Sequence, residues 1–290
     1  MLGALALGIV LGSCNIQTVQ AAEVSVQQTA QTPTYQVYVN RIANCVTVYA
    51  KDANGEYTVP VRSFACSCGR EGMETPLGSF RTSDYYPWRL MVDGSFGQYA
   101  IRFNRGILFH SVPYYTAKND DLEKDQFNLL GSDASLGCVR LAASDVKWLY
   151  DNCEKGTQVV VYDDAENPGP LGKPIQMQLN VEHPFAGWDP TDPNPENPWN
   201  TVRPSLYLTQ DMGDGVLYVP AGTTVEQLKQ YVGLKNVEGL AYAPQDYQLY
   251  INGNYDLNTQ GAYRVWISGQ DVAGTMVQQE MILAVVQYNN

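Results

Sequence analysis

The sequence is poor in histidine and in basic residues. It contains only two histidines, His110 and His183, and its 30 acidic residues outnumber its 18 basic ones, giving a formal net charge of −12. Nucleic-acid binding depends on clustered Lys and Arg, so this charge balance argues against a nucleic-acid partner. Zinc sites need four suitably spaced ligands, and the Cys-Ser-Cys run at 66–68 does not predict a metal site. The sequence also has no phosphate-binding glycine loop, so no nucleotide cofactor is expected.

A long hydrophobic run is also missing. The N-terminal stretch MLGALALGIVLGSC contains about a dozen apolar residues, too few to span a bilayer but typical of a signal-peptide core. We therefore expect an exported protein whose signal peptide occupies residues 1–22. Cleavage after Ala21, in TVQAAEV, is the favoured processing route. Lipid attachment at Cys14, which would anchor the protein to a membrane, is the alternative.

The cysteines allow several arrangements. The six are Cys14, Cys45, Cys66, Cys68, Cys138 and Cys153. If the first is removed with the signal peptide and Cys138 stays free, the remaining four allow three disulfide connectivities, and the sequence does not choose between them. Cys153 follows Val146 and Leu149 at helical spacing, which predicts a place on a buried helix face.

Strand patterning dominates the first half of the chain. Alternating apolar residues predict strands at YQVYVN, NCVTVYA, YTVPVRSFA, QYAIRF, GILFH and TQVVVY. Asn54-Gly55 suits a tight hairpin turn between the second and third of these. One helix is expected before the last strand, with Ser144 as its N-cap and Lys155-Gly156 at its end.

The composition changes after Tyr162. Residues 163–204 are rich in proline, and their aromatic residues Phe185, Trp188 and Trp199 predict that parts of this segment pack against a domain. Short strands return from Ser205 onward. The predicted fold is therefore mostly β, with a β-rich domain that has one or two helices and a C-terminal sandwich. The predicted segments are a signal peptide (1–22), a polar linker (23–33), a β-rich domain (34–162), a proline-rich linker or clasp (163–204) and a sandwich domain (205–290).

GSDASLGCVRL, at 131–141, contains the candidate nucleophile, Cys138. A catalytic thiol needs a neighbour that lowers its pKa or accepts its proton, usually a histidine. His110 ends a predicted strand upstream of the cysteine and is a better candidate than His183, which lies in a proline-rich segment. The amides around Leu136, Gly137 and Cys138 could point at a developing oxyanion. Arg140 could hold a carboxylate through its planar guanidinium.

Three sequence elements together resemble one family. FHSVPY and ASLGCVRL, with TPLGSF upstream, resemble the L,D-transpeptidases of the YkuD type over residues 34–162, including the family's closing helix and strand. The resemblance implies acyl transfer: a cysteine thiolate attacks the L-to-D bond of a peptidoglycan tetrapeptide stem, releases D-alanine and passes the acyl group to an amine. Stem peptides are the implied partners and carbapenems the implied inhibitors, and no cofactor is implied.

The resemblance assigns roles to individual residues. Cys138 matches the nucleophile, His110 its base, and Ser111 the residue that helps orient the histidine ring. Gly137 matches the oxyanion turn together with the cysteine. The remaining site positions are expected to shape the site or contact substrate; they are Ser135, Leu136, Arg140 and Tyr114. Leu136 occupies a position where the family usually has histidine, and the spacing between His110 and Cys138 is longer than the commonest one.

Other readings stay open at this point. Ser144 and Lys147 match a Ser-x-x-Lys pattern, although no Lys-Thr-Gly element accompanies it. The same thiol could act as an L,D-carboxypeptidase, because water and an amine meet the same acyl-enzyme. A catalytically inactive cell-surface binding or spacer protein is the non-enzymatic alternative. It is supported by YDLNTQGAYRVWISGQDVAG, which resembles bacterial immunoglobulin-like modules that could contact cell-wall or surface components.

Overall fold

The computed structural model describes residues 33–272 and 274–287. The predicted signal peptide, with Cys14 and Ala21, and nearly all of the polar linker lie outside these residues. No helix within the described ranges is both long enough and apolar enough to cross a membrane.

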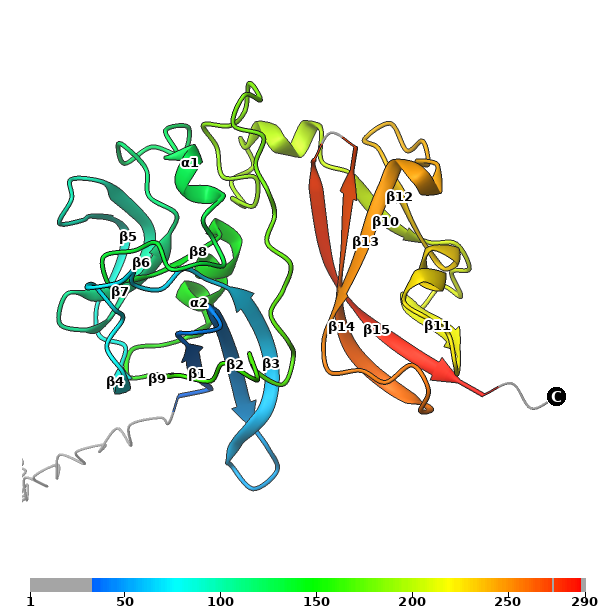
Figure 1. Cartoon of the computed structure of the whole chain (residues 1–290), viewed down its shortest axis with the longest axis horizontal. Coiled ribbons are helices and arrows are strands. Elements are labelled where there is room, and N and C mark those ends of the chain that lie inside the picture. The colour runs from blue at the N-terminus through cyan, green and yellow to red at the C-terminus, as the bar shows by residue number, and fades with distance from the viewer. Residues whose placement is uncertain (1–32, 273, 288–290) are drawn as a thin grey trace, which may run out of the picture. The chain divides into compact units, whose positions relative to one another are not determined.

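Nine strands and two helices make up the first region (Figure 1). The strands are β1 (Tyr35–Asn40), β2 (Cys45–Lys51), β3 (Tyr57–Ala65), β4 (Gly78–Arg81), β5 (Tyr85–Leu90), β6 (Phe96–Asn104), β7 (Ile107–Ser111), β8 (Val139–Leu141) and β9 (Gln158–Tyr162). The helices are α1 (Lys124–Phe127) and α2 (Ala143–Asn152). The observed β1 and β3 have the predicted bounds.

The first nine strands form two sheets. Their orders are β3-β2-β1-β9-β4 and β5-β6-β7-β8. In the second sheet β7 and β8 run parallel, with His110 opposite Arg140. This pairing places the histidine-bearing strand beside the strand that begins directly after Cys138. The sequence analysis missed β4 and β5, which are largely exposed and lack clear apolar alternation. It also missed β8, which has only three residues.

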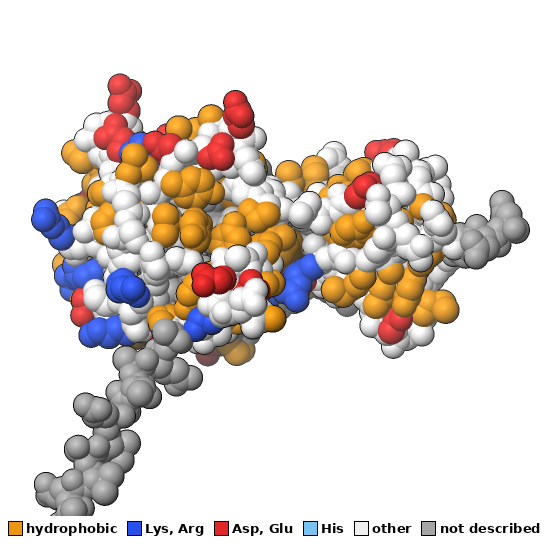
Figure 2. All heavy atoms as spheres, turned by 90° about the horizontal axis from the view of Figure 1, so that it is seen from below, with side chains coloured by type: hydrophobic (Ala, Val, Ile, Leu, Met, Phe, Trp, Pro, Cys, Tyr) orange, Lys and Arg blue, Asp and Glu red, His pale blue; other side chains and the backbone are white. Residues whose placement is uncertain are grey.

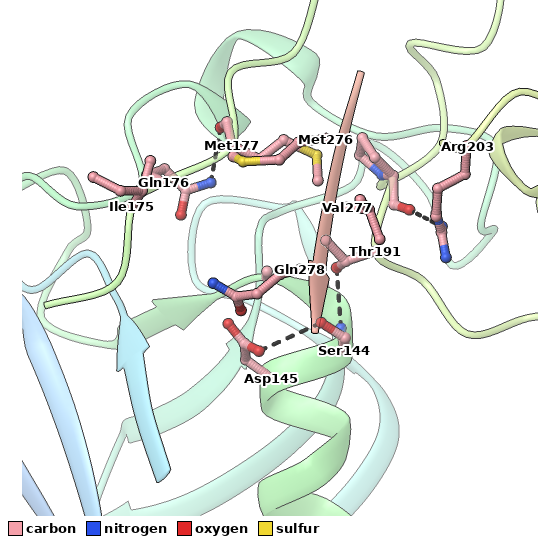
Figure 3. A pocket seen from close by; sticks show the side chains of 12 residues that line it. Ser144, Asp145, Ile175, Gln176, Met177, Thr191, Arg203, Met276, Val277 and Gln278 are labelled. Atoms are coloured by element: carbon pink, nitrogen blue, oxygen red, sulfur yellow. Dashed lines mark hydrogen bonds between the residues drawn. The ribbon is translucent and has the colours of Figure 1, made fainter. Parts of the chain in front are cut away.

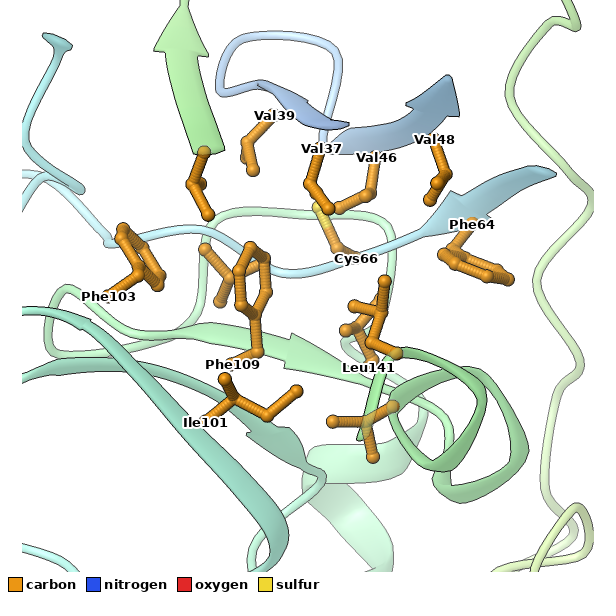
Figure 4. Packing of buried hydrophobic residues seen from close by; sticks show 14 of the residues in the cluster. Val37, Val39, Val46, Val48, Phe64, Cys66, Ile101, Phe103, Phe109 and Leu141 are labelled. Carbon is orange, nitrogen blue, oxygen red and sulfur yellow. The ribbon is translucent and has the colours of Figure 1, made fainter. Parts of the chain in front are cut away.

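Apolar side chains from both sheets and from α2 form one core. Figure 4 shows Val37 and Val46 of the first sheet facing Ile101 and Phe109 of the second. Phe109 precedes His110 and is 1% exposed. Because successive side chains of a strand point to opposite faces, burial of Phe109 in this core directs His110 to the other face of the sheet.

The ends of α2 differ from the prediction. The N-cap is Ala142, which forms no side-chain cap, and Ser144 lies inside the helix. Asp189 and Thr191 of the proline-rich segment instead accept hydrogen bonds from the first helical amides, at 2.9 Å from Ala143 N and 3.1 Å from Ser144 N. The helix ends at Asn152, before Gly156. Acceptors from a distant segment therefore replace the local cap.

The proline-rich segment packs as predicted from its aromatic residues. Trp199, in the short 3₁₀ helix η1 (Pro198–Thr201), is 4% exposed and shares a core cluster with Tyr114 and Phe127. Phe185 and Trp188 pack against the same cluster. The segment is therefore a packed clasp along this part of its length.

Six strands and two 3₁₀ helices make up the C-terminal region. The strands are β10 (Ser205–Leu208), β11 (Val216–Pro220), β12 (Val232–Lys235), β13 (Tyr247–Asn252), β14 (Gly261–Asp271) and β15 (Met276–Val286); the 3₁₀ helices are η2 (Glu226–Gln230) and η3 (Pro244–Asp246). One sheet pairs β10 with β12, and the other has the order β11-β15-β14-β13. This region is rich in sheet, as predicted, and its immunoglobulin-like identity stays a prediction.

The surface carries isolated exposed apolar side chains. Val92, Met212 and Val272 are among the most exposed. On the face shown in Figure 2, hydrophobic side chains lie among polar and charged ones. Exposed apolar residues are ordinary on protein surfaces, so exposure alone does not identify a site.

Candidate active site

Cys138 and His110 line the same cavity. Its volume is about 220 Å³, and its wall comes from the β5–β6 turn, from β6 and β7 with their connecting turn, and from the segment around β8. The lining residues are Arg89, Leu90, Met91, Val92, Asp93, Ser95, Arg102, Gly106, Ile107, Leu108, His110, Ser135, Leu136, Cys138 and Arg140. The structure thus brings together five of the residues singled out from the sequence, namely Cys138, His110, Ser135, Leu136 and Arg140.

Cys138 is partly exposed and carries a free thiol. Its Sγ lies 3.8 Å from the carbonyl oxygen of Gly106. Burial raises the pKa of this thiol above the ordinary value of 9.0, while a backbone hydrogen bond from Leu108 and the charge of Arg140 act in the opposite direction. The resting cysteine is therefore a thiol and needs a base during attack.

His110 is oriented by a backbone acceptor. The ring Nδ1 lies 2.6 Å from the carbonyl oxygen of Ser111. A carbonyl only accepts, so Nδ1 holds the proton and Nε2 keeps its lone pair. Burial, helped by the charge of Arg140, lowers the pKa of this histidine to about 3. His110 is therefore neutral near pH 7 and able to accept a proton at Nε2.

Ser111 acts on the ring through its carbonyl, while its hydroxyl supports the sheet. The hydroxyl accepts from Gln98 N at 2.9 Å and donates to Val112 O at 2.7 Å. Ser111 is fully buried. The predicted orienting position is thus in contact with His110, and the group that makes the contact belongs to the main chain.

Gly97 makes room for the histidine, a feature that sequence reasoning missed. A Cβ at this position would lie 2.8 Å from His110 Nδ1 and 2.9 Å from His110 Cβ. Both distances are shorter than normal packing allows. Gly97 is in β6, opposite Arg89 of β5, and a glycine inside a strand is the available signal of such close approach.

The turn before Cys138 is held by Ser135. Its hydroxyl accepts from Gly137 N at 3.0 Å and donates to Cys138 O at 2.5 Å. Gly137 has a φ of +113°, a conformation that favours glycine. Because Ser135 takes the Gly137 amide, that amide is not a free oxyanion donor. The Cys138 amide makes no hydrogen bond to any residue that the structure describes.

Arg140 is a buried cation at the cavity wall. It is 7% exposed, and its Nη1 donates to Gln126 Oε1 at 2.8 Å and to Ala134 O at 3.3 Å. Its Nε has no partner in the described structure. Burial lowers the pKa of the guanidinium, whereas the nearby Asp93 carboxylate raises it. A positive charge beside the thiol suits an anionic substrate group or intermediate.

The comparisons with known proteins bear on this same region. Residues 34–161 match the family model of the YkuD L,D-transpeptidase catalytic domain. The matched residues, 34–161, are called the YkuD domain below. The protein "Putative L,D-transpeptidase YciB" of Bacillus subtilis (strain 168) is 44% identical over 54 residues, which are 19% of this chain and 27% of that protein. The chain thus spans about a quarter of that relative's length.

Solved structures of L,D-transpeptidases also match. A structure of LdtMt1 in complex with imipenem is 22% identical with a TM-score of 0.36, covering 44% of this chain and 59% of that one. An L,D-transpeptidase from Mycobacterium tuberculosis H37Rv is 24% identical with a TM-score of 0.36, covering 45% and 58%. One from Mycobacterium smegmatis is 20% identical with a TM-score of 0.37, covering 44% and 58%.

Tyr114 of the YkuD domain does not line the Cys138 cavity. Its side chain is fully buried, and its ring makes an edge contact with Trp88 at a centroid distance of 5.1 Å. Its hydroxyl has no partner within the described residues. The structure therefore gives this tyrosine a place in the core and no contact with the cavity.

A second cavity of about 220 Å³ lies at the start of α2 (Figure 3). Ser144 and Asp145 line it together with Gln278 and Met276, and its described lining residues include neither cysteine nor histidine. Burial raises the pKa of Asp145 to about 7. The thiol and the imidazole singled out from the sequence line the other cavity, so the Cys138 cavity is the candidate active site.

The Ser-x-x-Lys reading finds no support in side-chain geometry. Ser144 Oγ donates to Asp145 Oδ1 at 3.4 Å. Lys147 Nζ instead pairs with Asp151 at 2.5 Å. The lysine therefore forms an ion pair with a residue on the next helical turn, away from the serine, and is not placed to activate the serine hydroxyl.

The other thiols of the YkuD domain are buried. Cys45, Cys66, Cys68 and Cys153 are free. Cys66 Sγ and Cys68 Sγ are 3.9 Å apart. Burial raises the pKa of Cys153 to about 12. Within the described ranges, no group of three or more His, Cys, Asp or Glu side chains is arranged to hold a metal ion.

Proposed function

We propose that this protein is a cysteine-dependent L,D-transpeptidase that cross-links peptidoglycan. The observation that carries the proposal is the presence of Cys138 and His110 in one cavity of a YkuD domain. The donor is a tetrapeptide stem, and the acceptor is an amine of a second stem. We also propose that the protein is exported, as the N-terminal sequence predicts.

The first half-reaction forms a thioester. Nε2 of His110 takes the thiol proton while Sγ of Cys138 attacks the carbonyl carbon of the L-to-D peptide bond. The carbonyl oxygen becomes an oxyanion beside the Cys138 amide. When the C–N bond breaks, His110 returns the proton to the leaving D-alanine nitrogen. The acyl group is then bound to sulfur.

The second half-reaction regenerates the thiol. An acceptor amine attacks the thioester carbonyl, His110 takes a proton from its nitrogen, and the new amide forms as the C–S bond breaks. The same proton then returns to sulfur. Water in place of the amine would give carboxypeptidase activity, so the acceptor determines which product forms.

Cys138 and His110 are both neutral at rest, so they do not form a thiolate–imidazolium ion pair before substrate binds. The proton instead moves from sulfur to His110 during the attack on the substrate. A histidine with a pKa of about 3 cannot deprotonate, at equilibrium, a thiol whose pKa lies above 9.0. The transfer becomes favourable only when negative charge moves from sulfur to the substrate oxygen. Arg140, at the cavity wall, and the Cys138 amide are the groups available to stabilise that charge.

Intact-mass spectrometry on residues 23–290 tests the proposal. The protein and its Cys138→Ala variant are incubated with a carbapenem and, separately, with a disaccharide tetrapeptide. We expect covalent adducts on the unmodified sequence alone, because the alanine variant lacks the nucleophile. An unmodified wild-type protein would favour a binding or spacer role.

Product analysis with and without an acceptor peptide identifies the reaction. Cross-linked product that depends on the acceptor supports transpeptidation. Release of a free tripeptide stem at the same rate with and without acceptor identifies a carboxypeptidase instead.

A further inference from the structure

Thr75 lies directly behind the turn that carries the nucleophile. It is located between β3 and β4, is fully buried, and does not line the Cys138 cavity. Its Oγ1 accepts a hydrogen bond from Gly69 N at 2.9 Å. The same hydroxyl donates to Gly137 O at 3.0 Å. Thr75 therefore connects the loop after β3 to the peptide unit that precedes Cys138.

The direction of this hydroxyl is fixed by its partners. A hydroxyl has one proton to donate. The Gly69 N–H already occupies an acceptor position on Oγ1, so the Thr75 proton is directed at Gly137 O. Gly69 permits this approach because a Cβ there would lie 2.0 Å from Met73 O and 2.7 Å from Thr75 N. The loop after β3 is thus folded tightly enough to hold the threonine in place.

The contact acts on the Cys138 amide through the planarity of the peptide bond. Gly137 C=O and Cys138 N–H belong to one peptide unit, and the described structure contains no cis peptide bond. In a trans unit the two groups point in opposite directions. Holding the carbonyl toward Thr75 consequently directs the Cys138 N–H away from it. That amide is free of hydrogen bonds to the described residues, whereas the Gly137 amide is bound to Ser135.

We propose that Thr75 is a positioning residue for the oxyanion donor. Its hydroxyl holds the Gly137–Cys138 peptide in the orientation in which the Cys138 N–H meets the developing oxyanion. The inference rests on the proposed acyl transfer at Cys138. It adds a specific requirement: formation of the acyl intermediate depends on the Thr75 hydroxyl, while the reactivity of the thiol itself does not.

Two reactions of the same thiol separate these effects. Acylation by a carbapenem passes through an oxyanion, whereas alkylation by iodoacetamide displaces iodide from a saturated carbon and forms none. For Thr75→Val we expect carbapenem acylation to slow by about a hundredfold to a thousandfold, the range for loss of one oxyanion donor. Iodoacetamide alkylation at Cys138, followed by peptide mapping, is expected to stay within about threefold of wild type.

Thr157→Val is the matched control. Thr157 is also fully buried, and its Oγ1 donates to a backbone carbonyl, Glu154 O, at 2.8 Å. This substitution removes a comparable hydrogen bond at the end of α2, so it controls for a general loss of stability. We expect both reactions of the control variant to proceed at wild-type rates when the protein is folded.

Thr75→Ser keeps the test decisive if the valine variant does not fold. The serine retains the hydroxyl, so acylation and alkylation are both expected within about threefold of wild type. Acylation of the serine variant that slows about a hundredfold or more with unchanged alkylation overturns the inference, because the hydroxyl would not be the group that matters.

The remaining outcomes separate this inference from the proposed function. If folded Thr75→Val is acylated at the wild-type rate, or loses both reactions equally, the positioning role is overturned while the proposed function stands. If wild-type Cys138 is alkylated but never acylated, the proposed function fails, and the inference fails with it.

Discussion

The YkuD domain and the C-terminal region are both rich in sheet, but their interiors differ in chemistry. The buried polar groups of the first include His110, Ser135 and Arg140, which line the cavity of Cys138. In residues 205–287 the buried polar groups are Thr223, Ser268 and Asp271. From residue 205 onward the sequence contains neither cysteine nor histidine. Among the residues that the structure describes, the cysteines therefore all lie in the first region.

This difference teaches how a site is held in place. Most buried polar groups are hydrogen-bonded, and each bond restricts the positions of both partners. In the YkuD domain these bonds hold the His110 ring at the Ser111 carbonyl and hold the turn before Cys138 through the Ser135 hydroxyl. The C-terminal core depends mostly on apolar contacts among residues such as Leu217, Val265 and Leu283, which define a fold without positioning reactive groups.

Among the variants considered, His110→Gln is expected to have the largest effect on the rate of acylation at Cys138. Glutamine keeps a polar side chain but cannot act as the base. General-base catalysis contributes about 10²- to 10⁴-fold, so carbapenem acylation should slow by that amount. The rate is measured by intact mass over time. An equal substitution at His183, which stacks on Trp199, is the control, and a wild-type rate for His110→Gln would contradict the assigned role.

Gly97→Ala is expected to have a smaller effect on the same reaction. The added Cβ forces the His110 ring to move, and a displacement of about 1 Å can cost up to roughly a hundredfold in rate. We expect acylation to slow between about tenfold and a hundredfold. Thr157→Val, at a buried residue that does not line the cavity, is the control for a general loss of stability. Equal acylation rates for the two variants would show that the added Cβ does not displace the His110 ring.

The pH dependence of the acylation rate tests the protonation states of His110 and Cys138. The pKa of His110 is lowered to about 3 from 6.5, so it stays neutral where an ordinary histidine titrates. The Cys138 thiol, with its raised pKa, stays protonated over the same range. Acylation is therefore expected to vary by less than about threefold between roughly pH 5 and pH 8. A rate that falls through a midpoint near 6.5 would show that the histidine is accessible to solvent.

The free energy of unfolding should also depend on pH through His110. A histidine with a depressed pKa binds its proton more weakly in the folded state than in the unfolded state. Its contribution to stability is thus present above pH 6.5 and is lost as the pH falls from 6.5 toward 3. Compared with wild type, His110→Gln should lose less stability over this window, as measured by chemical unfolding at several pH values.

Ser111→Ala separates the hydroxyl from the carbonyl. The carbonyl that orients His110 survives the substitution, so acylation should stay within about threefold of wild type. Loss of the hydroxyl leaves the buried Gln98 amide without its partner, which should cost about 1–3 kcal/mol of unfolding free energy. Denaturant unfolding and adduct formation are measured on the same preparation. A large loss of rate in a folded variant would assign the orienting role to the hydroxyl.

Leu283→Ala should leave the acylation rate unchanged. Leu283 is fully buried in the C-terminal core, and truncation of such a leucine costs about 2–5 kcal/mol. We expect unfolding of this region to become easier while Cys138 forms its carbapenem adduct at the wild-type rate. Slower acylation in the folded variant would show that the two regions are functionally coupled.

The sequence by itself located most strands of the first region and singled out Cys138 and His110 as the candidate pair. Alternating apolar residues located β1 and β3 at their observed bounds because side-chain direction in a strand has a period of two. Cys138 and His110 could be singled out because thiol chemistry needs a base and the chain has only two histidines. These signals are carried by residue type and local spacing.

The tertiary structure decided what holds the pair in position. The cap of α2 comes from Asp189, 46 residues after the amide that it accepts. Thr75 belongs to the quoted TPLGSF element, yet its contact with Gly137 spans 62 residues. Gly97 of β6 is required because an added Cβ would lie 2.8 Å from Nδ1 of His110, which belongs to β7. A one-dimensional pattern carries no information about such pairings, because they depend on which distant segments the packed sheets bring within hydrogen-bond distance.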